Sequence, residues 1–331
     1  MNVLLTGGTG YIGSHTALSL VKAGHQITLF DNLINSEKEV INRLESITRE
    51  KISFVKGNIN DTQFLSTTIN KNNIEVVMHF AGLKAVAESF EKPIDYYENN
   101  ISGTISLLRA MQENRVKKIV FSSSATIYGE PIYLPYDEIH PTSPINPYGF
   151  TKLFVENLLE DISRSFLDFS IVALRYFNPV GAHSSGLIGE DPRNKPNNLM
   201  PLISKVASGE IPNLSVFGGD YSTPDGTGVR DYIHVMDIAE GHLAALDFLQ
   251  KKKGFYAFNL GTSKGTSVLE LIEAFKKATG KEIPFKICAR RPGDIAISYA
   301  SADKALHELN WKASRSLEEM CFSAWKYKGY R

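Results

Sequence analysis

Thr6-Gly7-Gly8-Thr9-Gly10-Tyr11-Ile12-Gly13 is the stretch that decides the fold of this chain. The apolar residues 2–5 before it predict a short buried strand, and the apolar spacing of residues 11–23 after it predicts a helix. Glycines 8, 10 and 13 match G-x-G-x-x-G, and glycines 7, 10 and 13 match a looser G-x-x-G-x-x-G. Between a strand and a helix, this spacing favours a dinucleotide site, because the backbone can approach a pyrophosphate at the positive end of the helix. A glycine-rich turn without a ligand is the alternative interpretation.

The next predicted strand, residues 26–30, ends in Asp31. This acid follows the glycine turn at about the 20-residue spacing of dinucleotide sites, where it can accept hydrogen bonds from both ribose hydroxyls and repel a 2′-phosphate. The pattern therefore predicts NAD rather than NADP. Alternatively, Asp31 and Asn32 merely start a turn.

Composition excludes several classes of protein. The 36 basic and 36 acidic residues cancel, which argues against a nucleic-acid partner or an anionic membrane surface. No apolar run approaches the roughly 20 residues that span a bilayer, and the N-terminus is itself the first predicted strand. Cys288 and Cys321 lack metal-ligand spacing, so we expect reduced thiols, no metal and a cytoplasmic location.

Alternating strand and helix patterns fill the first half of the chain and predict a Rossmann-type, doubly wound parallel sheet of α/β class. From 178 to 198 glycine, proline and asparagine are dense and no long period survives, which is typical of a functional loop. We expect an NAD-binding domain at 1–174 plus roughly 229–260, and a smaller interleaved α/β substrate domain at 175–228 and 261–331. The substrate cleft is then expected between the two, beyond the carboxyl ends of the strands.

Ser124, Tyr148 and Lys152 are the candidate catalytic residues. Tyr148 and Lys152 are four residues apart on a predicted helix, so they share a face. A nearby ammonium and the positive nicotinamide ring both favour the phenolate, so we expect a tyrosine pKa below its usual value of ~10 and a general base usable near neutral pH. Ser124 follows the predicted strand 118–121 and could steady the proton. A chance Tyr-x-x-x-Lys at a helix start is the alternative.

These motifs together resemble the extended short-chain dehydrogenase/reductase family, and four longer blocks resemble its UDP-hexose 4-epimerase branch. The blocks are residues 79–86 (HFAGLKAV), 122–126 (SSSAT), 174–183 (LRYFNPVGAH) and 226–235 (GTGVRDYIHV). The likeness runs from Met1 to the last predicted helix. It implies a homodimer built on helices of the cofactor domain, for which the predicted helices at 100–114 and 148–164 are the candidates.

The resemblance also implies roles for individual residues. In the family, the position of Asn58 usually carries an aspartate that bonds the adenine amine, and asparagine can still accept that bond. Cofactor-binding positions implied are Gly7, Gly10, Tyr11, Ile12, Gly13, Asp31, Asn32, Asn35, Ser36, Asn58, Ile59, Phe80, Ala81, Gly82, Lys84, Asn99, Tyr148, Lys152 and Tyr176. Substrate-binding positions implied are Lys84, Ser124, Tyr148, Asn178, Asn198, Leu199, Phe217, Arg230, Arg291, Asp294 and Ser298. Among these, Phe217 would pack against uracil, Arg230 and Arg291 would take the diphosphate, and Asp294 would bond the uridine ribose.

The implied activity is the interconversion of UDP-glucose and UDP-galactose with retained NAD. Related dehydratases and decarboxylases carry acids just after the serine-rich strand end, where this chain has Ala125 and Thr126. A non-catalytic NAD-sensing module could dispense with Tyr148 and Lys152, which are present. Ser298 falls where family members restricted to plain hexoses carry tyrosine, so we expect turnover of UDP-GlcNAc and UDP-GalNAc as well. If Tyr299 fills that wall instead, the expectation fails.

Overall fold

A seven-stranded parallel sheet forms the centre of the computed structural model, which describes residues 1–191, 198–291 and 293–329. Its order is β11-β6-β5-β4-β1-β2-β3. The order reverses at β1, so the crevice beyond the carboxyl ends of β1 and β4 is the topological switch point where such sheets bind ligands. The strands are β1 (Asn2–Thr6), β2 (Gln26–Asp31), β3 (Ser53–Lys56), β4 (Val76–His79), β5 (Lys118–Ser124), β6 (Ser170–Tyr176) and β11 (Gly254–Leu260).

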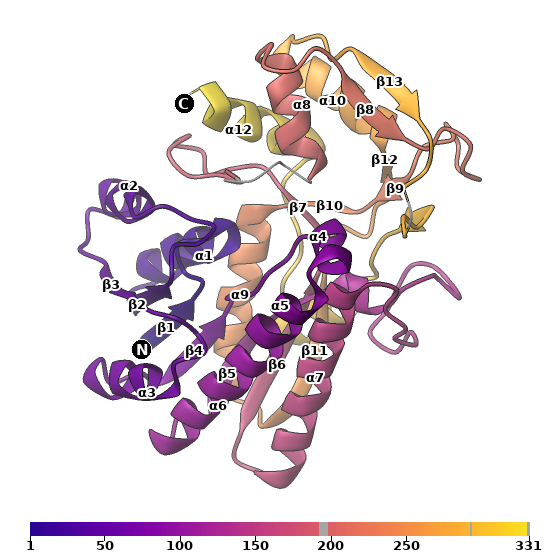
Figure 1. The fold of residues 1–331 in the computed structure, drawn as a ribbon. Helices are drawn as coiled ribbons and strands as arrows, with labels where there is room; N and C mark the ends of the chain where they lie inside the picture. Colours follow the sequence, from indigo (N-terminus) through magenta and orange to yellow (C-terminus); the bar gives the residue numbers. More distant parts are fainter. Residues whose placement is uncertain (192–197, 292, 330–331) are drawn as a thin grey trace.

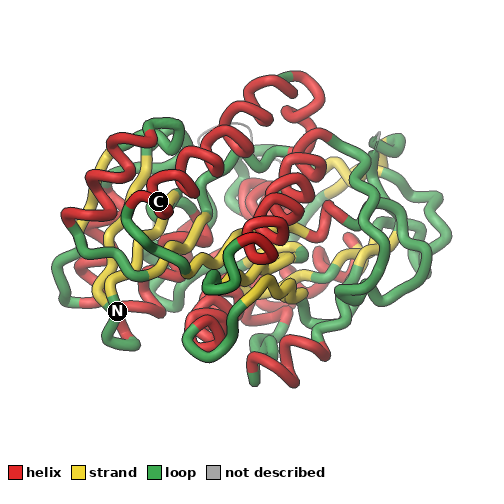
Figure 2. The backbone as a smooth tube through the Cα atoms, turned by 90° about the horizontal axis from the view of Figure 1, so that it is seen from below, coloured by secondary structure: helices red, strands yellow, loops and turns green. Residues whose placement is uncertain are grey.

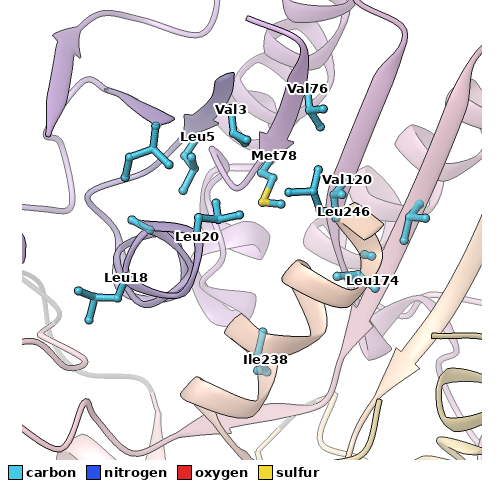
Figure 3. Close-up of a cluster of buried hydrophobic side chains, with 14 of the residues drawn as sticks. Val3, Leu5, Leu18, Leu20, Val76, Met78, Val120, Leu174, Ile238 and Leu246 are labelled. Carbon is cyan, nitrogen blue, oxygen red and sulfur yellow. The ribbon is translucent and has the colours of Figure 1, made fainter. Parts of the chain in front are cut away.

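Helices cover both faces of this sheet (Figure 1). On one face lie α1 (Tyr11–Lys22), α2 (Glu39–Thr48) and α9 (Val235–Leu249), and on the other α3 (Thr62–Lys71), α6 (Gly103–Glu113) and α7 (Pro147–Ser165). Alternate strand residues supply the two cores, because side chains of a strand point to opposite faces. Val3 and Leu5 pack toward α1 and α9, as Figure 3 shows, whereas Leu4 packs toward α3 and α6. The Rossmann-type doubly wound prediction is confirmed.

A smaller α/β unit lies beyond the carboxyl ends of the strands, at the top of Figure 1. Its core is formed by α8 (Leu199–Ala207), α10 (Val268–Thr279), α12 (Leu317–Gly329) and the parallel pair β8 (Leu214–Phe217) and β13 (Phe285–Cys288). Figure 2 shows the yellow strands of the molecule enclosed by red helices. Two small sheets join the units: β7 (Asn178–Val180) with β10 (Tyr232–His234), and β9 (Val229–Arg230) with β12 (Thr266–Ser267) and β14 (Ile297–Ser298).

Several helices escape the sequence analysis. These are α2, α4 (Val86–Glu91), α5 (Pro93–Tyr97) and α11 (Asp303–Leu309), most of them too short for a periodic signal. The helix expected from about 100 begins as a π-helical turn, Glu98–Ser102, before α6. Of the irregular stretch 178–198, residues 192–197 lie outside the described residues. Among the described residues, no helix is both long and apolar enough to cross a membrane.

Candidate active site

The glycine turn leaves no room for side chains between β1 and α1. Gly7 has φ +69°, and a Cβ on it would lie 2.7 Å from the backbone nitrogen of Ala81, at the end of β4. A Cβ on Gly13 would lie 2.5 Å from the Gly7 carbonyl oxygen. In the described chain, α1 begins after Gly10 with no side-chain cap and no acid in its first turn. The helix N-terminus beside Tyr11 and Ile12 thus presents backbone N–H groups and a positive dipole end, which suits a phosphate.

Asp31 is buried at the end of β2 and joins this turn to the following loop. Its Oδ2 accepts a hydrogen bond from the Thr9 backbone N–H at 3.2 Å, and its Oδ1 accepts from the Leu33 N–H at 2.9 Å and from Ser36 Oγ at 3.3 Å. A carboxylate has about four lone-pair sites, so capacity for a further donor remains. The structure therefore brings Asp31 and Ser36 together beside the glycine turn.

The other residues expected at the adenosine end form local turns. Asn32 Oδ1 accepts from the Ile34 N–H at 3.0 Å, and Asn58 Oδ1 accepts from the Asn60 N–H at 3.0 Å. Asn35 and Asn58 are exposed, whereas Ile59 is buried in the core beside α3 and α6. Asn58 therefore orders its own turn at the carboxyl end of β3, and its side-chain amide is left at the surface for a further contact.

Ser124, Tyr148 and Lys152 meet at the carboxyl end of β5. Ser124 ends the strand, and its Oγ accepts hydrogen bonds from the Thr126 backbone N–H at 3.2 Å and the Thr126 hydroxyl at 2.9 Å. Tyr148 lies in the first turn of α7, which Asn146 caps by accepting from the Gly149 N–H at 2.8 Å. Lys152 Nζ donates to the Ser122 carbonyl oxygen at 2.7 Å and lies 5.8 Å from the centroid of the Tyr148 ring.

Burial controls the acidity of these groups. It raises the pKa of Tyr148 to about 12, although a hydrogen bond with Ser124 works against the rise. Burial also lowers the pKa of the Lys152 ammonium to about 8, opposed by the charge of Glu156. For the protein's own residues, without NAD, the pKa of Tyr148 therefore moves opposite to the predicted direction, because the loss of hydration is the largest cause.

The remaining residues of the cofactor prediction lie after β4, at the end of β6 and in the π-helical turn. Tyr176 Oη lies 2.5 Å from His242 Nε2, and the Phe80 ring packs against the same histidine at 4.7 Å between centroids. A Cβ on Gly82 would lie 3.6 Å from Lys152 Nζ, which places the β4 loop beside the catalytic candidates. Asn99 Nδ2 donates to Asn100 Oδ1 at 3.0 Å, at the π-helical turn.

Lys84 and Asn198 are joined by a residue that the sequence did not indicate. Lys84 Nζ forms an ion pair with Glu190 Oε1 at 3.1 Å and lies 5.9 Å from the centroid of the Tyr11 ring. Asn198, which precedes α8, donates its side-chain N–H to the same oxygen of Glu190. A residue expected at the phosphates and one expected at the sugar are therefore held together by one carboxylate, while Leu199 begins α8.

Phe217, Arg291 and Asp294 form a second group, in the smaller unit. The Arg291 guanidinium lies 4.8 Å from the centroid of the Phe217 ring, and its Nε donates to Asp294 Oδ2 at 2.9 Å. Arg230 Nη1 instead donates to the Val229 carbonyl oxygen at 2.9 Å. Asn178 begins β7, where its backbone N–H donates to Asp231. The structure thus clusters the residues expected at uracil and ribose, while the Arg230 guanidinium bonds the backbone of β9.

Ser298 shares a face with Arg230. The two residues are paired in register between the parallel strands β14 and β9, so their side chains point to the same side. Val229 and Tyr299 point to the other side, since a Cβ on Gly265 would approach Val229 Cγ1 at 2.6 Å and Tyr299 Cδ1 at 3.5 Å. Tyr299 therefore does not replace Ser298 on the Arg230 face.

Comparison with known proteins places this geometry in a family. Residues 4–323 match the family model described as GDP-mannose 4,6 dehydratase. The UDP-glucose 4-epimerases of Dictyostelium discoideum and Bacillus subtilis are 54% and 52% identical, and the matches cover 98% and 99% of this chain and 95% and 97% of theirs. The chain belongs to the UDP-glucose 4-epimerase family. A crystal structure of a family member from Stenotrophomonas maltophila, with bound NAD and formylated UDP-arabinopyranose, is 50% identical with a TM-score of 0.98, covering 100% of this chain and 98% of that one.

Two positioning residues of this family member escaped the sequence analysis. Asn100 is buried, and its side chain accepts from the Leu83 N–H at 2.8 Å and donates to the Leu83 carbonyl and to Thr151 Oγ1, both at 3.0 Å. It thereby fixes the β4 loop against α7 next to Lys152. Thr126 is the second, because its backbone N–H and its hydroxyl both donate to Ser124 Oγ and so fix that side chain. The residues around Asn100 in the sequence do not indicate this role, because a short π-helical turn produces no recognisable periodicity.

Proposed function

We propose that this chain is an NAD-dependent UDP-hexose 4-epimerase that interconverts UDP-glucose and UDP-galactose. The observation that carries the proposal is the meeting of Ser124, Tyr148 and Lys152 beside a glycine turn shaped for a dinucleotide, in a chain more than 50% identical to curated UDP-glucose 4-epimerases over its full length. Members of this family with known structures hold NAD, and the fit of Gly7, Gly13 and Asp31 around the α1 N-terminus supports the same cofactor here.

In the mechanism, the protein places the sugar and moves a proton. When bound, NAD would supply a positive ring and the hydride chemistry at C4 of the sugar. Tyr148 accepts the proton of the 4-hydroxyl as general base, and Ser124 holds that hydroxyl. Burial places the pKa of Tyr148 about two units above its usual value, which corresponds to ~3 kcal/mol against the phenolate. The Lys152 ammonium lies where it offsets part of this cost.

The two ligands are proposed to lie in the two units of the fold. Residues 1–174 and 229–260 would hold NAD through most of the cofactor residues named above, with Asp31 on the adenosine ribose, and Tyr176, just beyond residue 174, would lie against the nicotinamide. Residues 175–228 and 261–331 would hold the UDP-sugar, with Phe217 at uracil and Asp294 at the ribose. For Arg291 to take the diphosphate, its guanidinium must exchange at least part of its pairing with Asp294 for the phosphates.

The proposed substrate range includes UDP-GlcNAc and UDP-GalNAc. Ser298 supports this extension, because it lies beside Arg230 on the face where the sugar is expected, and a serine leaves space for a 2-acetamido group. Its hydroxyl can also bond the amide.

A dehydratase activity is less compatible with the site, although the matching family model bears that name. Elimination of water needs an acid or base beside the strand end, where this chain has Ala125 and Thr126. The Thr126 hydroxyl is committed to Ser124 Oγ at 2.9 Å. Neither side chain can exchange a proton at neutral pH.

The direct experiment mixes purified protein with UDP-galactose without adding NAD. We expect UDP-glucose to form, because the cofactor is regenerated in each cycle and stays bound. A preparation shown to contain NAD(H) that forms no UDP-glucose would refute the proposal. Detection of a 6-deoxy-4-keto sugar would instead favour the dehydratase.

We also propose that the protein forms a homodimer and that it acts in the cytoplasm. The outer surface of α5 and α7 exposes four large apolar side chains, those of Ile94, Tyr97, Phe150 and Phe154. A hollow lined by Ile105, Leu108, Leu158 and Ile162 separates α6 from α7. Contiguous apolar surface of this kind marks protein–protein contact sites. Light scattering at micromolar concentration is expected to give the dimer mass, and Ile94→Glu with Phe154→Glu to give the monomer; a wild-type monomer would exclude the dimer.

A further inference from the structure

A buried carboxylate lies one helical turn from Lys152. Glu156 follows Lys152 by four residues on α7, as Lys152 follows Tyr148, so the three side chains share one face of the helix. Only 4% of the Glu156 side chain is exposed. The proton transfer assigned to Tyr148 and Ser124 makes no use of Glu156.

Two residues of the central sheet clamp this carboxylate. Arg175 Nη2 donates to Glu156 Oε2 at 2.7 Å, and Arg175 Nε donates to both carboxylate oxygens at 3.1 and 3.2 Å. The Ser123 hydroxyl donates to Oε1. Ser123 and Arg175 are paired in register between β5 and β6, one residue before Ser124 and Tyr176. The clamp is therefore anchored to the same strand ends that carry the catalytic site.

The clamp is itself held from the other side. Arg175 Nη1 donates to Tyr128 Oη at 2.9 Å and to the Glu138 carbonyl oxygen at 3.2 Å, and Tyr128 Oη donates to Asn259 Oδ1 at 2.6 Å. Every donor of this network has a buried acceptor, so the carboxylate has little freedom to move. A buried ion pair is weak evidence of a stabilising role, since well-packed apolar residues are often as stable. The position of this ion pair beside Lys152 indicates a role other than stability.

That role concerns the positive charge of the Lys152 ammonium. The groups near its ammonium are Tyr148 and Glu156 on α7, His79 on β4 and the Phe121 ring on β5, which lies 4.9 Å from Lys152 Nζ. His79 stays neutral, because burial lowers its pKa to about 3, and Glu156 is the acid among these groups that favours the protonated lysine. Arg175, being cationic, would disfavour it if the carboxylate were removed.

We propose that Glu156, clamped by Arg175 and Ser123, is a positioning residue of the epimerase reaction that keeps the Lys152 ammonium beside the Tyr148 ring in its charged form. This inference rests on the proposed function. Without the carboxylate, Lys152 loses its proton at lower pH, and the phenolate of Tyr148 loses the charge that supports it. The expected signature is an earlier fall of kcat as pH rises, with an unchanged KM, because Glu156 touches no substrate.

The test compares the holoenzyme with its Glu156→Gln variant between pH 6 and 9.5, with UDP-galactose as substrate. The descending limb of kcat should move down by about one pH unit, the lower end of the effect of a close charge, which is a ~5-fold loss at pH 8 for a lysine with a pKa of about 8. Glu160→Gln is the matched control, because Glu160 lies one turn further along α7, bonded to Arg164 at 2.7 Å on the surface. Its profile should superimpose on that of the wild type.

Two further variants separate charge from packing. Glu156→Asp keeps the charge, so its descending limb should stay near that of the wild type even if kcat falls. Glu156→Gln with Arg175→Met also removes the guanidinium that the single variant leaves unpaired, and should show the early descending limb if the single variant does not fold. Superimposable wild-type and Gln profiles, or an Asp profile shifted as far as Gln, would overturn the inference.

A readout independent of turnover distinguishes this inference from the proposed function. NMR of protein labelled at lysine Cε, with the Lys152 signal assigned through Lys152→Arg, follows the titration of the ammonium directly. A lower Lys152 pKa in Glu156→Gln supports the inference, and an unchanged pKa refutes it. Failure of the wild type to convert UDP-galactose would refute the proposed function alone.

Discussion

Replacing Ser298 by tyrosine tests the proposed substrate range at one position. Ser298 lies on the Arg230 face of β14, so a tyrosine there would project into the space where the sugar is expected. The backbone cannot easily shift away, because two of its carbonyl groups are hydrogen-bonded. The Ser298 carbonyl oxygen accepts from the Asp231 N–H, and the Tyr299 carbonyl oxygen accepts from the Tyr136 N–H, both at 3.0 Å. The ring must therefore occupy the pocket itself.

The expected loss falls on the N-acetylated substrates. A plain hexose has only a hydroxyl at C2, whereas an acetamido group would overlap the new ring as the keto sugar turns. One such clash in a pocket is worth roughly 1–3 kcal/mol, which is about 10- to 200-fold in relative kcat/KM. UDP-glucose and UDP-galactose should be turned over nearly as before.

The assay measures kcat/KM for all four UDP-sugars in the wild type, Ser298→Tyr and a control, Tyr299→Ser. Because the ratio of acetamido to plain activity is compared within each variant, a loss of stability does not affect it. Tyr299 faces Gly265 on the opposite side, so its replacement should leave the ratio unchanged. Three results would refute the reasoning: no N-acetyl turnover by the wild type, equal slowing of both substrate pairs by Ser298→Tyr, or a raised ratio in Tyr299→Ser.

Three further predictions follow from the same geometry. Tyr148→Phe should retain NAD and lose epimerisation by roughly 10²-fold or more, as expected for a general base; unchanged turnover would exclude Tyr148 from that role. Gly13→Ala should purify with much less NAD, because its Cβ would lie 2.5 Å from the Gly7 carbonyl oxygen, whereas Gly329→Ala, with open space around it, should retain the cofactor. Acid should destabilise the fold, because burial lowers the pKa of five histidines below the value of ~6.5 that they have when unfolded. Their pKa is about 3 for His15 and His79, and about 4 for His183, His234 and His242. Between pH 6.5 and 4 only the unfolded chain takes up these protons, so each histidine costs about 1.4 kcal/mol of stability per pH unit as pH falls, and thermal unfolding that is flat from pH 7 to 5 would contradict this.

Features that depend on residues close together in the chain could be predicted from the sequence. The glycine turn, Asp31 and the Tyr148–Lys152 pair need only a strand, a turn and a helix in order, and the structure places Tyr148 and Lys152 on one face of α7. The cap of α3 is local in the same way, since Asp61 Oδ1 accepts from the Phe64 N–H at 2.9 Å. Local hydrogen bonds and periodicity determine such features, and both are written in adjacent residues.

Acidity was the property that the sequence misjudged. The spacing of Tyr148 and Lys152 shows that a cation is near the phenol, but not how completely both groups lose water. In the folded chain that loss dominates, raising the pKa of Tyr148 to about 12 and lowering that of Lys152 to about 8. Burial is the sum of contacts from β4, β5, β6 and α7, so it exists only once these elements are packed.

By itself, then, the sequence determined the doubly wound α/β fold, the glycine turn and the pairing of Tyr148 with Lys152 on one helix face, because each depends on residues within a few turns of one another. Only the tertiary structure decided which distant residues support them. Glu190 meets Lys84 across 106 positions of chain, Asn100 meets Thr151 across 51, and Arg175 reaches Glu156 from a neighbouring strand. The same holds for Ser298, whose face is set by its register with Arg230. Such pairings come from sheet order and helix packing, which bring together residues that no local pattern connects.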